Sequence, residues 1–416
     1  MRQIVHRNAF TLIEVLVVLI ILSILAAMVT TAVSGVRTTA REARTKRIIS
    51  VVDSVISEHY EQLRYRPLPV EIPDLYNFSP SGGVIGYEVL SDETARVRLM
   101  MLRDMQRMEL PDRFTDITNQ PALIAAAANR VKEVGGEIVA SRADKAERQL
   151  FRVAWYDTTQ SAENIPAKLS AYRSRLSGRQ TVEHQGAECL YMILSTSFVG
   201  GQPAIGAIPD SNIGDTDDDG MMEVLDGWGQ PLQFVRWPVG FTPSVSGVPP
   251  NIDFELSMDV ERPDDFDLFR SDYAYVAAKG PAWATDAKNQ NTDATNPNAK
   301  HRPWSMKPLI FSSGEDEESG IALNPGDQVG LPNATFAYTA SDWNWPVDTA
   351  HYGVEAAGRG SDPLPYVDPY LRRFIELNGD GKRLPGELLG NSPAQWNQSS
   401  EQATDNLTNY QLQVSP

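Results

Sequence analysis

The feature that most constrains this chain is an uncharged apolar run near its N-terminus. Between Val15 and Val36 the sequence contains no charged side chain. About 20 apolar residues are enough for a helix to cross the hydrocarbon core of a bilayer. Residues 10–36 therefore predict one transmembrane helix. The mean hydropathy of the whole chain is −0.31, which excludes a polytopic membrane protein.

The helix is predicted to continue beyond the membrane. No proline occurs between Phe10 and Arg66, and Pro67 is the residue that ends the pattern. Apolar residues recur in the second half at the spacing of one helical face: Ile49, Val52, Ile56, Tyr60 and Leu63. We expect residues 37–66 to be an amphipathic continuation that buries this stripe against a globular domain.

A cleavable secretory signal peptide, with its site near Ala26 or Ala27, is the alternative interpretation of the apolar run. Such a peptide has an apolar core of about 7–15 residues. The run in this chain is longer, and it leads without a proline into the amphipathic helix. A retained anchor is therefore the preferred interpretation.

The residues around the start of the run carry a family resemblance. A short basic leader, residues 1–9, precedes the sequence FTLIEVLVVLIILSILAAM. This arrangement resembles the N-terminal signature of type IV pilins and of the pseudopilins of type II secretion systems. The resemblance implies cleavage between Ala9 and Phe10 by a prepilin peptidase, methylation of the new terminus at Phe10, and an assembly role for Glu14. The family usually has glycine before the cleaved bond, where this chain has Ala9.

Glu14 is a carboxylate inside an apolar segment, and such a group is costly in lipid unless it is neutralised. Cleavage before Phe10 would create an ammonium one helical turn away. The ammonium of a neighbouring subunit can neutralise the same carboxylate when helices pack in the membrane. Glu14 is therefore expected to set the register between subunits.

The resemblance also implies a location and a set of partners. It places a single anchor in the cytoplasmic (inner) membrane and the globular domain in the periplasm, although the basic residues of segment 37–47 alone favour the opposite orientation. The implied partners are prepilin peptidase, other pseudopilin subunits, the secretion platform protein, the assembly ATPase and inner-membrane lipid. The formal net charge of −17 argues against a nucleic-acid partner.

The remainder divides into three segments by composition. Residues 67–195 read as a mainly helical insertion, with helices expected at Glu93–Arg107, Pro121–Val134, Lys145–Tyr156 and Glu188–Leu194. Residues 196–390 read as a β-rich domain, with strands expected at Leu232–Arg236, Tyr273–Ala277, Leu309–Phe311 and Thr335–Tyr338. Residues 391–416 are rich in Asn, Gln and Ser and are expected to be a loosely held polar tail.

Two further phrases resemble the pseudopilins. Asp226-Gly-Trp-Gly-Gln-Pro is similar to the Asp-Pro-Trp-Gly-x-Pro turn that opens a sheet strand in the major pseudopilins. Residues 309–316 resemble a later strand of that family, which runs into a calcium-binding loop. Glu317 stands where that loop has glycine.

The acidic residues between Asp210 and Asp226 predict a metal site. This segment has seven carboxylates and no basic residue. Positions 1, 3, 5, 6 and 12 of a calcium loop are matched by Asp215, Asp217, Asp219, Gly220 and Asp226. The alternative is a solvated acidic turn. A second calcium-loop spacing runs from Glu376 to Glu387, and the acidic run Glu315–Glu318 is expected to be a solvated loop.

The sequence contains no zinc-protease, phosphate-loop, dinucleotide or nucleophile-elbow motif. Its single cysteine, Cys189, lies in an apolar run and excludes an intrachain disulfide. We therefore expect a non-enzymatic α+β protein of pilin-like fold, in which a long helix packs on a small antiparallel sheet. The predicted function is that of a type II secretion pseudopilin. The alternatives are a type IV or competence pilus subunit and a single-pass, membrane-anchored enzyme or binding protein.

Overall fold

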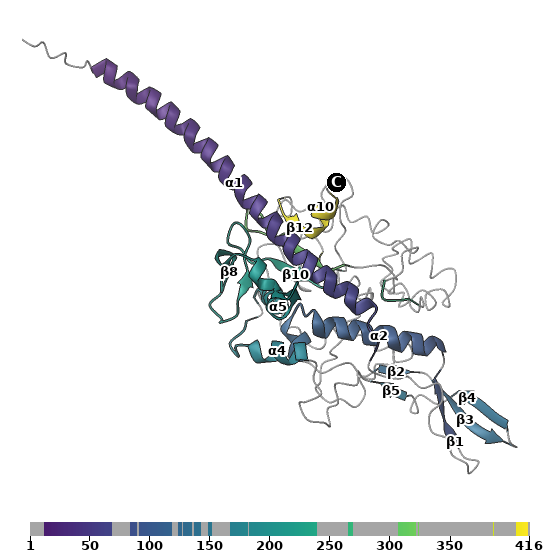
Figure 1. The fold of residues 1–416 in the computed structure, drawn as a ribbon. Coiled ribbons are helices and arrows are strands. Elements are labelled where there is room, and N and C mark those ends of the chain that lie inside the picture. Colours follow the sequence, from purple (N-terminus) through teal and green to yellow (C-terminus); the bar gives the residue numbers. More distant parts are fainter. Residues whose placement is uncertain are drawn as a thin grey trace, which may run out of the picture.

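The computed structural model describes residues 12–68, 84–89, 91–118, 124–126, 128–134, 137–142, 149–151, 167–181, 183–238, 265–268, 307–321, 323, 386 and 405–414. Over these residues the architecture is α+β, as expected. One long helix is followed by shorter helices and by small antiparallel sheets (Figure 1).

Helix α1 (Leu12–Arg64) is one unbroken helix of 53 residues with two different surroundings. Its first half projects away from the rest of the molecule, and its apolar side chains there are exposed (Figure 1). Its second half lies against the globular part, and all five residues of the predicted stripe, from Ile49 to Leu63, are buried. The helix ends at Arg64, shortly before Pro67. The same helix thus provides an apolar projection and one wall of the core.

A three-stranded antiparallel sheet packs on this second half. It contains β10 (Gln233–Val235), β11 (Leu309–Ser312) and β12 (Leu407–Thr408), with β11 in the middle. The strands expected at Leu232–Arg236 and Leu309–Phe311 are therefore confirmed. The strands expected at 273–277 and 335–338 lie outside the described residues.

The C-terminal segment is held more firmly than its composition indicated. Strand β12 extends the sheet, and the following helix α10 (Asn409–Val414) contacts α1. The Asn409 side chain, 2% exposed, donates from Nδ2 to Asp53 Oδ1 (2.7 Å) and to the carbonyl of Pro308 (3.1 Å). The expected loose tail is therefore wrong over residues 405–414, because its amide side chains satisfy buried partners instead of water.

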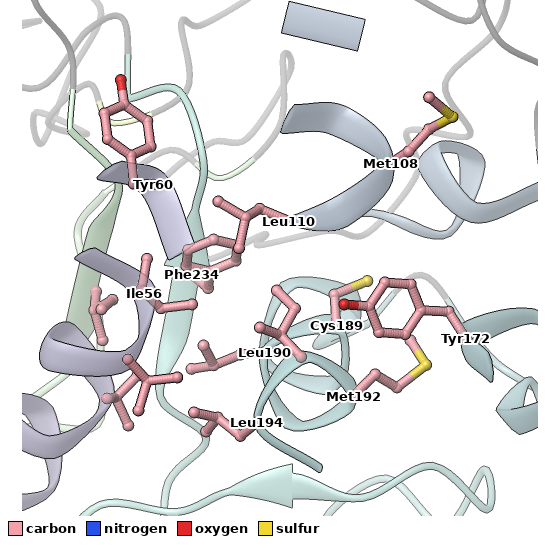
Figure 2. Close-up of a cluster of buried hydrophobic side chains, with 14 of the residues drawn as sticks. Ile56, Tyr60, Met108, Leu110, Tyr172, Cys189, Leu190, Met192, Leu194 and Phe234 are labelled. Atoms are coloured by element: carbon pink, nitrogen blue, oxygen red, sulfur yellow. The ribbon is translucent and has the colours of Figure 1, made fainter. Parts of the chain in front are cut away.

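A second group of helices packs into the same core as α1 and the sheet. It comprises α2 (Ser91–Glu109), α3 (Phe114–Thr118), α4 (Ala167–Arg175) and α5 (Gln185–Thr196). The helices expected at Glu93–Arg107 and Glu188–Leu194 are confirmed by α2 and α5. Figure 2 shows Ile56 of α1 and Phe234 of β10 near Leu190 of α5 in the shared core. Cys189 is buried in the same cluster, and burial raises the pKa of its thiol well above the ordinary range.

The helices expected at Pro121–Val134 and Lys145–Tyr156 are wrong where the structure describes them. These segments contain β2 (Ile124–Ala126), β3 (Ala128–Val134) and β5 (Gln149–Phe151). Strand β3 lies between β1 (Val84–Val89) and β4 (Glu137–Arg142), and Val134 pairs with Glu137. The residues between them are Gly135 and Gly136, and a Gly-Gly pair is a strong signal for a two-residue hairpin. This pair in the sequence was the available signal for strands on either side of it.

Short elements connect α5 to β10. They are β6 (Phe198–Val199), β7 (Gln202–Pro203), the 3₁₀ turns η3 (Ala204–Ala207) and η4 (Asp210–Asn212), and the paired strands β8 (Ile213–Gly214) and β9 (Glu223–Val224). The loop between β8 and β9 contains the predicted acidic motif.

Candidate functional site

The β8–β9 loop brings three of the predicted metal ligands together. Each of Asp215, Asp217 and Asp219 offers a carboxylate oxygen, and these three oxygens lie within 4.8 Å of one another. The loop turns sharply at Asp218 and Gly220, which have φ values of 58° and 92°. Glycine adopts this left-handed conformation without steric cost, so the Gly at the sixth position of the motif serves the turn as predicted.

Hydrogen bonds fix one oxygen each of Asp215 and Asp217 and both oxygens of Asp219. The amide of Gly220 donates to Asp215 Oδ2 (3.0 Å), and the hydroxyl of Thr181 donates to Asp217 Oδ2 (2.9 Å). Asp219 accepts from the amides of Thr181 (2.6 Å) and Met221 (2.8 Å). The loop carboxylates are therefore oriented by the protein.

Two glutamates that the sequence interpretation did not include complete the cluster. Glu188 lies in the first turn of α5, and Glu223 begins β9. Glu188, Asp217 and Glu223 form a second group whose carboxylate oxygens lie within 4.8 Å of one another. Both glutamates have an exposed fraction of 0%. We call the five residues Glu188, Asp215, Asp217, Asp219 and Glu223 the acidic site.

Five buried carboxylate oxygens of this site have no hydrogen-bond donor within the described part of the chain: Glu188 Oε1, Glu188 Oε2, Asp215 Oδ1, Asp217 Oδ1 and Glu223 Oε1. Unpaired buried oxygens are costly and are rare in native proteins. Burial, together with the charges of Asp219, Asp217 and Glu223, raises the pKa of Glu188 to about 9. Burial is also the main cause that raises the pKa of Glu223 to about 7.

This arrangement suits a hard cation. The donor set consists of carboxylate oxygens, which divalent cations such as Ca²⁺ and Mg²⁺ prefer. A cation would satisfy the unpaired oxygens and lower the mutual repulsion of the carboxylates. The structure therefore contains a buried acidic cluster that could hold a metal ion.

The fourth predicted ligand, Asp226, has a different position and role. Its Oδ1 accepts the amides of Trp228 (2.8 Å), Gly229 (2.8 Å) and Gln230 (2.9 Å). Its Oδ2 accepts the hydroxyl of Ser312 at 2.6 Å. Asp226 belongs to neither of the acidic groups found among the described residues. It closes the turn at 226–230 and joins that turn to β11.

The same turn lies directly on α1. The amide of Gly227 donates to Thr45 Oγ1 (2.8 Å), and a Cβ at this position would overlap the backbone of Arg41. Glycine is therefore required by the close approach of two backbones. The Asp-Gly-Trp-Gly phrase thus fixes the segment after the acidic site against the long helix.

The remaining predicted sites give a mixed picture. The loop Glu315–Glu318 is exposed, and the amides of Glu315 and Asp316 donate to Asp405 Oδ2 at 2.6 and 3.1 Å. The second calcium-loop spacing, Glu376 to Glu387, lies outside the described residues except for Gly386.

The N-terminal processing residues, Ala9 and Phe10, also lie outside the described residues. Glu14 occupies the first turn of α1 and is exposed in the isolated chain. Among the described helices, α1 is the one with the length and apolar composition needed to cross a bilayer.

The comparison with known protein families identifies this N-terminal region. Residues 5–30 match the prokaryotic N-terminal methylation motif, the prepilin-type signal typical of type IV pilins and pseudopilins. The chain is thus a prepilin-like protein with the signal that prepilin peptidase processes, and with an apolar helix suited to an inner-membrane anchor. Neither the curated proteins nor the solved structures include a match to the chain.

Proposed function

We propose that this protein is a structural, non-enzymatic pseudopilin of a type II secretion system. Prepilin peptidase cleaves it between Ala9 and Phe10, and the mature subunit is assembled into a short periplasmic filament. Its partners are other pseudopilin subunits, the platform protein, the assembly ATPase and inner-membrane lipid. The observation that carries the proposal is one continuous helix, α1, that joins the methylation motif at residues 5–30 to a domain packed on its second half.

The turn at 226–230 favours secretion over the alternative of a type IV or competence pilus. Its sequence resembles the turn of the major pseudopilins, and its Gly227 lies against α1 as a strand-opening turn would. Strand β10 follows directly and pairs with β11. The pilus alternative predicts long surface fibres, whereas the pseudopilin proposal predicts a short filament that is needed for protein export.

Mass spectrometry of the mature chain, combined with Glu14→Leu, tests the proposal. We expect an N-methylated Phe10 and, in Glu14→Leu, normal cleavage with loss of filament assembly and of secretion. Glu61→Leu, at an exposed position near the other end of α1, is the matched control and should assemble. An intact Met1, a terminus near Met28, or normal secretion in Glu14→Leu would contradict the proposal.

We also propose that the acidic site takes Ca²⁺. Ca²⁺ accepts six to eight oxygens in flexible geometry and tolerates bidentate carboxylates, whereas Mg²⁺ requires a near-ideal octahedron. The site supplies closely spaced carboxylates on a loop, which suits the first ion better. Calorimetry on the full-length chain in detergent should detect Ca²⁺ binding, with Mg²⁺ much weaker. Absence of Ca²⁺ binding would contradict this part of the proposal.

A further inference from the structure

The acidic site includes a carboxylate from a core helix as well as those from the loop. Glu188 belongs to α5, which contacts β9 and β10. At Gly186, two residues earlier, a Cβ would lie 2.8 Å from the carbonyl oxygen of Phe234. The backbone of α5 is therefore pressed against β10, so Glu188 is presented to the loop from a rigid position.

Both oxygens of Glu188 lack a donor among the described residues, and the side chain is fully buried. It lies in one group with Asp217 and Glu223. A solvated acidic turn would not need a buried glutamate from another element aimed into it. No lysine or arginine in the described part of the chain forms an ion pair with any residue of the acidic site.

The oxygen pattern fits one cation. The two free oxygens of Glu188 suit bidentate coordination, while Asp215, Asp217 and Glu223 each offer one free oxygen and hold the other by a hydrogen bond. Glu188, Asp217 and Glu223, whose carboxylate oxygens lie within 4.8 Å of one another, offer four of these oxygens, and waters commonly complete the six to eight that Ca²⁺ takes. Asp226, which the calcium-loop spacing assigned to the last position, is occupied by the turn amides and Ser312.

We propose that Glu188 and Glu223 form a divalent-cation site with Asp217, so that one ion ties helix α5 to the β8–β9 loop. This inference rests on the proposed Ca²⁺ binding and adds its ligand set and its structural role. In this arrangement Glu188 replaces Asp226 as the bidentate ligand that closes the loop. The bound ion holds the loop, and through it the turn on α1, against the core.

The test is Ca²⁺ calorimetry and thermal unfolding of the full-length chain in detergent, using Glu188→Gln and Glu223→Gln. Each variant should lose at least about tenfold in Ca²⁺ affinity, since even a supporting outer partner of a metal costs that much. In EDTA, Glu188→Gln should unfold at the same temperature as the wild type or higher, because it removes an unpaired buried carboxylate. Its unfolding temperature should respond little to added Ca²⁺.

A merely structural role for Glu188 predicts the opposite pattern, a lower unfolding temperature in EDTA with a retained response to Ca²⁺, and would overturn the inference. Asp210→Asn, at an exposed position of the same acidic segment, is the matched control and should bind Ca²⁺ as the wild type does. Wild-type binding that is lost in Asp217→Asn but unchanged in Glu188→Gln would retain the proposed Ca²⁺ loop and reject the bridge to α5. A wild type that binds no Ca²⁺ would reject both.

Discussion

Asp226 shows how a single residue can satisfy a sequence pattern and yet serve another purpose. Its spacing fits the last position of a calcium loop, but its carboxylate accepts three backbone amides and one hydroxyl. It is 2% exposed. A carboxylate that already has four donors has few lone pairs left for a metal ion. The spacing of acidic residues alone could not reveal this, because Ser312 comes from a distant strand.

Replacing this residue should therefore affect folding and leave metal binding unchanged. In Asp226→Ala, the turn amides and the Ser312 hydroxyl lose their acceptor, and we expect the free energy of unfolding to fall by about 2–4 kcal/mol. Ca²⁺ affinity, measured by calorimetry on the folded chain, should equal that of the wild type. Asp210→Ala serves as the control for both measurements. A marked loss of Ca²⁺ affinity in Asp226→Ala would restore it as a ligand.

At the scale of elements, two of the contacts between the long helix and the rest of the domain depend on particular residues. One is the turn at 226–230, where Gly227 touches the backbone of α1. At the other contact, the end of α1 meets α2 and α4 around a pocket of about 470 Å³. His59, Arg66, Glu109 and Lys168 are among the residues that line it.

Gly227→Ala should weaken the docking of the turn. The added methyl group would overlap the Arg41 backbone, which belongs to a regular helix and cannot yield easily. Overpacking of this kind costs about 1–3 kcal/mol, and urea unfolding in detergent measures it. Gly206→Ala is the control, because nothing lies within 4 Å of a Cβ there. Equal stability of the two variants would contradict the close approach.

His59 makes the contact with α4 dependent on pH. Its Nδ1 lies 2.9 Å from Lys168 Nζ, and burial, followed by the charge of Lys168, lowers the pKa of His59 from 6.5 to about 4. The folded state therefore binds a proton less readily than the unfolded state, so stability is lost as the pH falls from 6.5 towards 4.

In His59→Gln this part of the pH dependence should disappear, since Gln keeps an acceptor for Lys168 without a titrating ring. Unfolding free energies at pH about 7 and about 5 should differ less in the variant than in the wild type. Lys168→Met should also reduce the difference, because it removes the neighbouring positive charge. An identical pH profile in all three proteins would contradict the assignment.

At the scale of the whole molecule, the parts that the sequence predicted are those encoded by local pattern. The apolar run and the stripe from Ile49 to Leu63 identified α1, and short β-rich runs identified β10 and β11. Features that depend on distant partners were missed, such as Glu188 in the acidic site and Asn409 against Asp53. The charged residue at the start of the otherwise apolar Glu188–Leu194 run was the available signal for Glu188.

The free half of α1 supports a last prediction about assembly. Its apolar side chains are exposed in the isolated chain, so lipid or neighbouring copies of the helix must cover them. The single cysteine, Cys189, is fully buried, and the raised pKa of its thiol makes it unreactive. Single cysteines introduced in turn at positions 16, 17, 18 and 19 should therefore report helix contacts without background.

We expect oxidation in membranes to give cross-linked dimers whose yield varies around the helix, because a disulfide requires Cα atoms closer than about 7 Å. The yield should fall when Glu14→Leu is added, because we propose that this carboxylate sets the register of neighbouring helices. The wild type should give no dimer. Equal yields at all four positions, or yields that Glu14→Leu leaves unchanged, would indicate random collision in the membrane instead of ordered packing of the helices.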